Sequence, residues 1–119
     1  MLLDSVVLID HFNGVEAATA FLRKVTSPHI SAITRAEVLA GFDSAELAIV
    51  RALLDRFPML SIDAAVADLG AELRRTHGWK LPDALQAAVA RCHGLLLATR
   101  NTKDFPPERF EFVRVPYRL

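Results

Sequence analysis

The fold is decided by the stretch Met1-Leu2-Leu3-Asp4-Ser5-Val6-Val7-Leu8-Ile9-Asp10. Its first apolar residues predict a short buried strand, and Asp4 and Ser5 then interrupt the apolar run. Residues 6–12 predict a helix, although their β-branched side chains would also suit a strand. A carboxylate that follows a strand in this way can reach a cleft at the edge of a sheet.

The remaining chain alternates between apolar strands and amphipathic helices. This alternation predicts one α/β domain over residues 1–119, with a mostly parallel central sheet covered on both faces. The further strands are predicted at residues 29–33, 59–62, 95–99 and 112–115. The further helices are predicted at residues 16–25, 34–40 and 44–57, after Asp63 as a cap, and from Pro82 to about His93.

Composition narrows the class of protein. The chain has 119 residues, 52% of them hydrophobic, which suits one domain with a sizeable core. Lys and Arg together number 14, as do Asp and Glu, so the whole-chain charge gives no evidence for nucleic-acid binding. No apolar run is long enough for a membrane span and no signal peptide is recognised, so the expected location is the cytoplasm.

Cys92 is the only cysteine. A single cysteine excludes an intramolecular disulfide framework and any zinc site built from several cysteines. The residue lies in an alanine-rich apolar segment, so a buried thiol is expected rather than a nucleophile.

Four further polar residues, like Asp4, lie at or near the ends of predicted strands and helices. They are Glu37, Asp83, Asn101 and Asp104. Carboxylates that converge on one cleft repel one another and raise each other's pKa unless a cation neutralises them. An all-oxygen set is the kind that Mg²⁺ or Mn²⁺ prefers, and such a cation can activate a water for attack on a phosphate.

Each of these residues also has an ordinary structural explanation. Asp4 could cap the following helix, and Glu37 could complete a capping box that begins at Thr34. Asp83 would suit the first turn of a helix, while Asn101 and Asp104 are common turn residues. The two explanations are compatible, because a cap residue can still point into a cleft.

Four segments, in order along almost the whole chain, resemble the PIN-domain ribonucleases of the VapC toxin type. The resemblance implies a PIN-like α/β/α sandwich that cleaves RNA with Mg²⁺ or Mn²⁺ as the toxin of a toxin–antitoxin pair. It also implies a cognate antitoxin partner that inhibits the protein, and a homodimer. The segments are Leu2-Leu3-Asp4-Ser5-Val6-Val7-Leu8-Ile9-Asp10, Ser31-Ala32-Ile33-Thr34-Arg35-Ala36-Glu37-Val38-Leu39-Ala40-Gly41, Leu81-Pro82-Asp83-Ala84-Leu85-Gln86-Ala87-Ala88-Val89-Ala90 and Leu97-Ala98-Thr99-Arg100-Asn101-Thr102-Lys103-Asp104-Phe105.

By position in these motifs, the resemblance implies Asp4 and Asp83 as the main metal ligands. It implies Glu37 as a further ligand or as the group that orients the water. Asn101 and Asp104 match a variable fourth corner of the acidic site. Ser5 matches a position where the family usually has a hydroxyl that binds near the metal or the phosphate.

One departure from the family motif supports a second function. The family commonly has Asn two residues after the first Asp, whereas this chain has Val6. A catalytically impaired PIN-like module that acts by binding a protein or RNA partner is therefore the alternative. A metal-dependent phosphatase ranks last, because Asp4 has no second Asp two residues later.

Basic and aromatic residues near the motifs could contact RNA. Arg100 and Lys103 flank the last motif and could bind phosphates, with solvated surface charge as the alternative. Lys80, with its arginine neighbours on the preceding helix, offers a second basic group. Trp79 could stack a base, but anchoring of a loop or burial in a dimer interface is the expected role.

Overall fold

The computed structural model describes residues 1–119, which form six helices and five short strands. No backbone segment needs a cis peptide bond. The strands are β1 (Leu2–Leu3), β2 (Ile30–Ser31), β3 (Met59–Leu60), β4 (Leu97–Ala98) and β5 (Val113–Arg114). The helices are α1 (Ser5–Phe12), α2 (Glu16–Lys24), α3 (Ala32–Ala40), α4 (Leu47–Leu54), α5 (Ala64–His77) and α6 (Leu81–Cys92).

All strand pairs are parallel. One group has the order β1-β4-β5 and the other pairs β2 with β3, and a parallel bridge between Leu2 and His29 joins the two groups. β1 therefore lies in the middle, with Leu2 opposite Leu97 and Leu3 opposite Ala98. Because parallel strands end at the same edge, the residues after β1 and β4 are brought together there.

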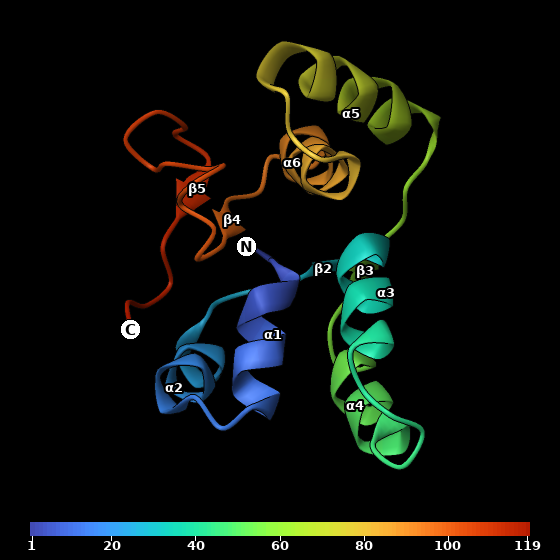
Figure 1. Ribbon diagram of the computed structural model, residues 1–119, viewed down its shortest axis with the longest axis vertical. Helices are drawn as coiled ribbons and strands as arrows, with labels where there is room; N and C mark the ends of the chain where they lie inside the picture. The colour runs from blue at the N-terminus through green and yellow to red at the C-terminus, as the bar shows by residue number, and fades with distance from the viewer.

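Successive residues of the central strands face two different cores. Leu2 and Leu97 pack with apolar residues of α5, α6 and β5, whereas Leu3 and Ala98 pack with residues of α1, α3 and α4. This alternation is the two-residue period of a strand, and it explains why β1 and β4 are apolar throughout. Figure 1 shows α5 and α6 on one side of the strands and α1 to α4 on the other. The predicted sandwich with a parallel sheet is confirmed.

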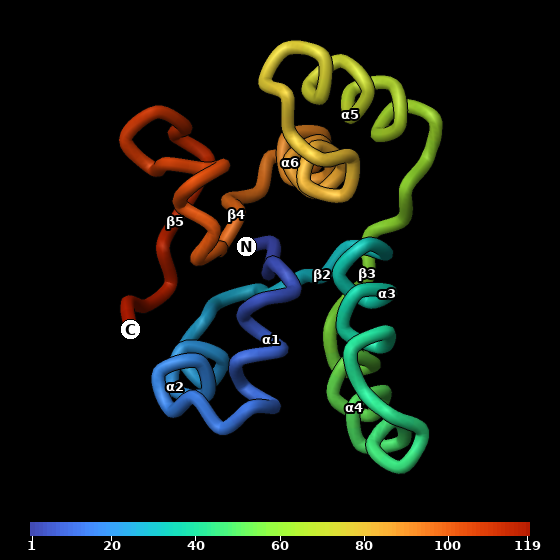
Figure 2. Tube along the Cα trace, in the orientation of Figure 1, coloured from blue at the N-terminus to red at the C-terminus, as the bar shows by residue number.

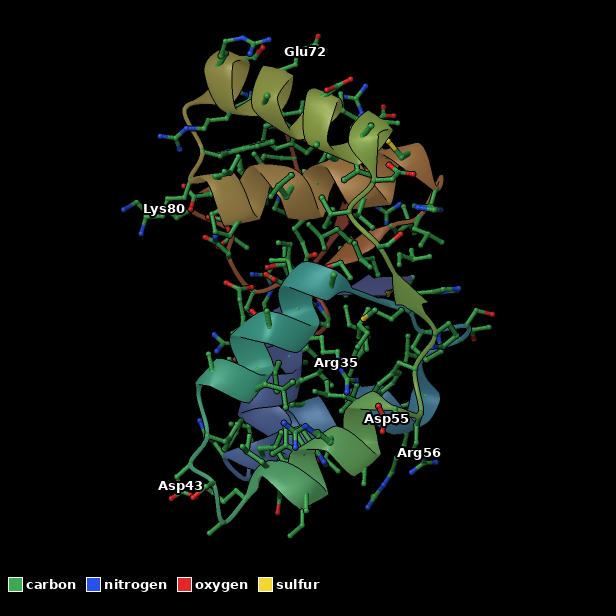
Figure 3. The ribbon with its side chains drawn as sticks, turned by 90° about the vertical axis from the view of Figure 1, so that its right-hand side faces the viewer. Arg35, Asp43, Asp55, Arg56, Glu72 and Lys80 are labelled. Carbon is green, nitrogen blue, oxygen red and sulfur yellow. The ribbon has the colours of Figure 1, made fainter.

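The two chain ends have different surroundings. Figure 2 shows the N-terminal residues entering the centre of the molecule, while the C-terminal tail runs along the outside past β5 towards α1 and α2. Tyr117 in this tail packs its ring near that of Phe21 on α2, with centroids 6.3 Å apart. On the opposite surface, Arg35 of α3 forms a salt bridge with Asp55 at the end of α4 (Figure 3). Exposed pairs of this kind contribute about 1 kcal/mol or less.

Several local predictions need correction. Residues 5–12 are helical, so the alternative of a strand over residues 6–12 is wrong. The helix predicted at residues 44–57 is shorter and spans only Leu47–Leu54. The capping box at Thr34 is wrong, because Ser31 caps α3 and accepts a hydrogen bond from the Thr34 backbone nitrogen. Cys92 is exposed at the end of α6, so the prediction of a buried thiol is also wrong. None of the helices is both long and apolar enough to cross a membrane.

The tightest helix contact predicts a sensitive position. A Cβ atom at Gly70 of α5 would lie 2.6 Å from the Leu85 Cδ2 atom and 3.5 Å from the Leu85 Cα atom of α6. Leu85 can turn away from a methyl group, but a branched side chain would push the helices apart. Gly70→Val is expected to lower the free energy of unfolding by about 1–3 kcal/mol in urea titrations.

Ala67→Val is the matched control, since Ala67 lies exposed on the same helix. It places a valine on α5 where the side chain meets no close neighbour. Since valine is a better helix former than glycine, helix propensity alone should not destabilise Gly70→Val. A Gly70→Val variant as stable as the unsubstituted protein would show that the contact between α5 and α6 is not tight at Gly70.

Candidate metal site at the carboxyl edge of the sheet

Asp4 lies where β1 ends and α1 begins. Its backbone nitrogen donates to the Ala98 carbonyl oxygen (3.0 Å), which fixes it beside the end of β4. One carboxylate oxygen accepts hydrogen bonds from the Ser5 nitrogen (2.9 Å) and Gln86 Nε2 (3.2 Å). The other accepts from Thr99 Oγ1 (2.6 Å). Asp4 is therefore the N-cap of α1, as one interpretation predicted, and it is also held by two distant segments.

A buried amide joins three of the four motif segments. Gln86 Nε2 donates both to Asp4 and to Thr34 Oγ1 (2.6 Å), while its Oε1 atom accepts from the Ser31 hydroxyl. Thr34 in turn donates to the Leu3 carbonyl oxygen (3.0 Å). No buried side-chain nitrogen or oxygen atom in the structure lacks a hydrogen-bond partner. A fully satisfied buried network fixes its members rigidly, so it orients Asp4.

The surroundings of Glu37 and Asp83 raise the pKa of both carboxyl groups. Although the Glu37 side chain is partly exposed, partial desolvation and the charges of Asp4 and Asp83 raise the pKa of its carboxyl, and a hydrogen bond with Ser5 offsets only part of this. Partial burial and the charges of Asp4 and Asp104 likewise raise the pKa of the Asp83 carboxyl, against the nearby Lys80. Asp4 thus contributes to the raised pKa of both Glu37 and Asp83, which indicates that these carboxylates lie near one another.

Asn101 and Asp104 form a closed turn at the fourth corner. Asn101 Nδ2 donates to an Asp104 carboxylate oxygen (3.0 Å), and the Asp104 nitrogen donates back to Asn101 Oδ1 (3.3 Å). The Asn101 nitrogen donates to Thr99 Oγ1 (3.0 Å), which links this turn to Asp4. Trp79 Nε1 donates to the Asp104 carbonyl oxygen (3.0 Å), so the predicted role of Trp79 in anchoring a loop is confirmed.

The polar side chains of this cluster are of the chemical kind that binds a hard divalent cation. The cluster consists of carboxylates and one amide, and nitrogen or sulfur ligands are absent from it. As the side chains stand, no three carboxylate, imidazole or thiol groups approach closely enough to hold one ion. Because Glu37 and Asp83 are on helix surfaces and carry raised pKa values, a cation would draw their carboxylates together and relieve the repulsion.

Arg100 was expected to contact a phosphate, but its guanidinium is bound to a carboxylate of the protein itself. Its guanidinium forms two parallel hydrogen bonds with the buried Asp10 carboxylate, at 2.7 and 3.1 Å. Tyr117 also donates to Asp10 (2.7 Å). Asp10 therefore joins α1 both to the segment after β4 and to the C-terminal tail. Lys103 is exposed and has no ion-pair partner, whereas Val6 lies on α1 and offers no polar atom.

The residues that orient the site were not singled out from the sequence. Gln86 lies within an alanine-rich helix, and its only signal was a polar residue on a face otherwise filled with Ala84, Ala87 and Ala88. Thr99 lies at the end of an apolar strand, where threonine is common. Ser31, which caps α3, follows a buried isoleucine and resembled a strand residue.

The fold and the acidic cluster together define an α/β protein with carboxylates at the carboxyl edge of a parallel sheet. The model of the PIN domain matches residues 1–106, and the chain belongs to the PIN domain family. The predicted family resemblance is thereby confirmed.

Individual relatives narrow the comparison to the VapC type. The chain is similar to ribonuclease VapC10 of Mycobacterium tuberculosis, at 37% identity over the whole chain and 94% of the relative. It is 29% identical to ribonuclease VapC19 of the same organism, over 98% of each. Among solved structures it resembles a chain of a toxin–antitoxin complex from Klebsiella pneumoniae, with 36% identity, a TM-score of 0.91, and coverage of 99% of this chain and 98% of that one.

The buried network predicts a strong effect at Gln86. Gln86→Leu keeps the apolar surroundings of α6 but leaves the Ser31, Thr34 and Asp4 groups with fewer partners. Each buried polar group left unpaired costs about 1–3 kcal/mol, so a clear fall in the urea midpoint is expected. In a double-mutant cycle with Thr34→Val, the two effects should not add. Additive effects would show that Gln86 and Thr34 do not act as one network.

The Asp10 contacts predict a pH-dependent contribution to stability. Burial opposes ionisation of Asp10, but hydrogen bonds from Arg100 and Tyr117 outweigh it and lower the pKa of this carboxyl. A carboxylate with a lowered pKa stabilises the fold above its unfolded pKa and loses that effect as the pH falls through the folded pKa. Asp10→Asn should therefore cost about 1–3 kcal/mol at neutral pH and progressively less in acid.

Urea titrations across the acid range measure this difference. Asp68→Asn is the control, because Asp68 is exposed on α5 and has no ion-pair partner. A cost at Asp10 that does not change with pH would contradict the assignment of charge-dependent hydrogen bonds.

Proposed function

We propose that the protein is a metal-dependent endoribonuclease that acts as the toxin of a toxin–antitoxin pair. The proposal rests on the position of Asp4 at the carboxyl edge of the sheet, beside the Asn101 and Asp104 turn, where neighbouring carboxylates also raise the pKa of Glu37 and Asp83. Repelling carboxylates of this kind are unfavourable unless a cation binds between them. The relatives named as ribonucleases match this chain in sequence over 94% and 98% of their lengths, which supports RNA as the substrate.

Each residue then has a distinct role. Asp4 and Asp83 would hold Mg²⁺ or Mn²⁺, with Asp4 fixed in advance by Thr99 and Gln86. When bound, such a cation neutralises charge on the phosphodiester and makes a water more acidic. Glu37 would orient the attacking water and accept its proton, because desolvation and the neighbouring carboxylates raise the pKa of its carboxyl.

Other residues near the cluster would support binding. Asn101 and Asp104 would close the fourth corner, either as direct ligands or through ordered water. Ser5, which hydrogen-bonds with Glu37, would hold that carboxylate or a phosphate oxygen. Lys103 is free to contact the RNA backbone, as is Lys80, which points into solvent beside the start of α6 (Figure 3). Arg100 would contribute to RNA binding only if it left Asp10.

The proposal includes a protein partner. A structural relative with 36% identity belongs to a toxin–antitoxin complex, which supports a cognate antitoxin for this chain. A basic side chain of that partner, placed among the four carboxylates, would compete with the metal. A homodimer and a cytoplasmic location belong to the same proposal. The apolar side chains of Ile49 and Leu81 are exposed, and a partner or a second copy could cover them.

A binding module without catalysis is the second candidate. Val6 and the separation of the carboxylates are the observations that favour it. Titration of Mn²⁺ by calorimetry separates the two functions. A nuclease should show saturable binding that Asp83→Asn removes, whereas a binding-only module should show no such site.

The decisive experiment is cleavage of single-stranded RNA by the purified protein. Cleavage should require Mg²⁺ or Mn²⁺ and stop in EDTA. Asp4→Asn and Asp83→Asn should each slow it by roughly 10²-fold or more, because charge stabilisation at the reacting phosphate is lost. Thr99→Val removes the hydrogen bond that Thr99 donates to Asp4 and the one that it accepts from the Asn101 nitrogen, and should slow cleavage by about 10- to 100-fold.

Asp68→Asn serves as the control, since it removes one exposed carboxylate from α5 and should leave the rate unchanged. Cleavage that persists in EDTA and in both aspartate variants would reject the proposed chemistry.

A further inference from the structure

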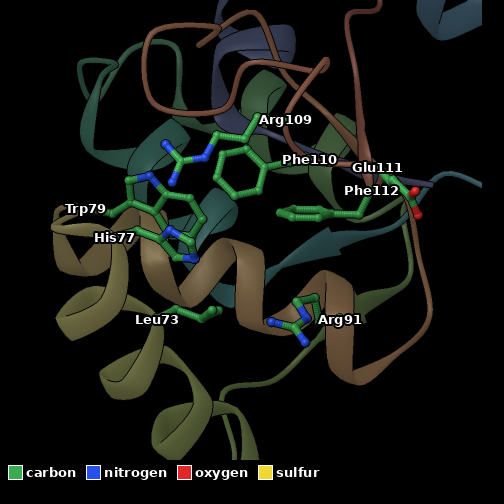
Figure 4. Close-up of a pocket in the computed structure, with 8 residues that line it drawn as sticks. All are labelled: Leu73, His77, Trp79, Arg91, Arg109, Phe110, Glu111 and Phe112. Atoms are coloured by element: carbon green, nitrogen blue, oxygen red, sulfur yellow. The ribbon is translucent and has the colours of Figure 1, made fainter.

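A pocket lined in part by Trp79 lies outside the acidic cluster. It is a pocket of about 380 Å³ between the end of α5, the outer face of α6 and the segment that precedes β5 (Figure 4). Trp79 forms part of its wall and donates a hydrogen bond to the Asp104 carbonyl oxygen, so the pocket and the cluster share this residue. Nothing in the proposed chemistry uses the pocket.

The wall of the pocket is a continuous aromatic surface. His77 stacks on Trp79, with ring centroids 4.3 Å apart and planes 21° apart. His77 also contacts the Phe110 ring edge to face, at 5.3 Å, and Phe110 contacts Phe112 at 5.9 Å. Trp79 is buried, but the other three rings are partly exposed. Figure 4 shows these rings around the hollow, so a flat ligand could pack against them.

Two guanidinium groups stand at the rim of the same pocket. Arg109 lies over the Phe110 ring, at 5.3 Å from the centroid, and Arg91 approaches from the last turn of α6 (Figure 4). Both side chains are exposed and neither has a salt-bridge partner. The one carboxylate that lines the pocket, Glu111, forms no ion pair with them. The pocket is therefore aromatic and net positive in a chain whose total charge is zero.

We propose that this pocket binds one nucleotide of the RNA substrate outside the cleavage site. The base would pack on the rings of His77, Phe110 and Phe112, and the guanidinium of Arg91 or Arg109 would hold the adjoining phosphate. Unstacked bases bind aromatic side chains in this way, and arginine matches phosphate geometry. The proposal rests on RNA being the substrate.

The geometry of α6 favours RNA over a peptide as the occupant. Asp83 lies in its first turn and Arg91 in its last, eight residues later, which separates them by roughly 12 Å along the axis. A strand along this helix would place one phosphate at the acidic cluster and another beside Arg91. A nucleic acid supplies an anion and a planar group at every step, whereas a peptide would need an acidic and an aromatic side chain in matching places.

The test measures RNA binding without cleavage. A fluorescein-labelled, short single-stranded oligoribonucleotide of mixed sequence is titrated with the protein in EDTA, and anisotropy gives the Kd. Trp79 is the only tryptophan, so its emission reports directly on the pocket wall. Binding should change that emission in the unsubstituted protein. Arg91→Gln and Phe110→Leu should each raise the Kd by roughly fivefold or more.

Arg51→Gln is the matched control, because Arg51 is exposed on α4, far from the pocket, and the substitution removes the same charge. Circular dichroism confirms that Phe110→Leu remains folded, and the exposed Arg91→Gln variant tests the site without touching the core. With metal present, both pocket variants should raise the KM for RNA more than they lower kcat.

The outcomes separate this proposal from the proposed function. Equal affinity in Arg91→Gln, Phe110→Leu and Arg51→Gln would overturn the pocket assignment, even if metal-dependent cleavage is intact. Weakened binding of the antitoxin in the pocket variants, with RNA binding unchanged, would also overturn it and make the pocket a protein-docking surface. Loss of RNA affinity in the pocket variants would support the subsite even in a protein that failed to cleave RNA.

Discussion

The hydrogen bond from Gln86 to Asp4 is the constraint on which the rest of the site depends. It joins residues 82 positions apart in the sequence and brings the start of the chain against α6. The same amide fixes Thr34 and Ser31 at the beginning of α3. One buried side chain therefore sets the relative positions of β1, α3 and α6, the elements that carry Asp4, Glu37 and Asp83. A short parallel sheet with two-residue strands could not fix these positions alone.

The carboxylates of the cluster are held unequally. Asp4 accepts three hydrogen bonds, so its charge is supported by the protein itself. Glu37 and Asp83 lack comparable donors, and desolvation together with neighbouring charge raises the pKa of each. In the proposed cation site, this asymmetry would give one rigid ligand and two that could adjust. Only the less restrained carboxylates would then need to move for a cation to bind.

The sequence predicted the parts of the structure that local patterns determine. Apolar strands followed by polar residues predicted both the parallel sheet and the edge at which Asp4 and Asn101 lie. Long-range partners were not predictable, because periodicity does not show which helix lies next to which strand. Gln86 was missed for this reason, and Arg100 was expected to face RNA because its partner Asp10 lies 90 residues away. Ser31 was missed because a cap and a strand end look alike in sequence.

Residues 99–101 show how the two parts of the site are tied together. Thr99 donates to Asp4, Arg100 to Asp10, and Asn101 to Asp104, so three consecutive side chains bind three different carboxylates. Side chains alternate along an extended segment, which turns Thr99 and Asn101 to the cluster and Arg100 to the opposite side. Arg100 thereby anchors the segment on one side, through Asp10, while Thr99 orients Asp4 on the other side. In the proposed ribonuclease, Arg100 would therefore not be available to an RNA phosphate while it is bound to Asp10.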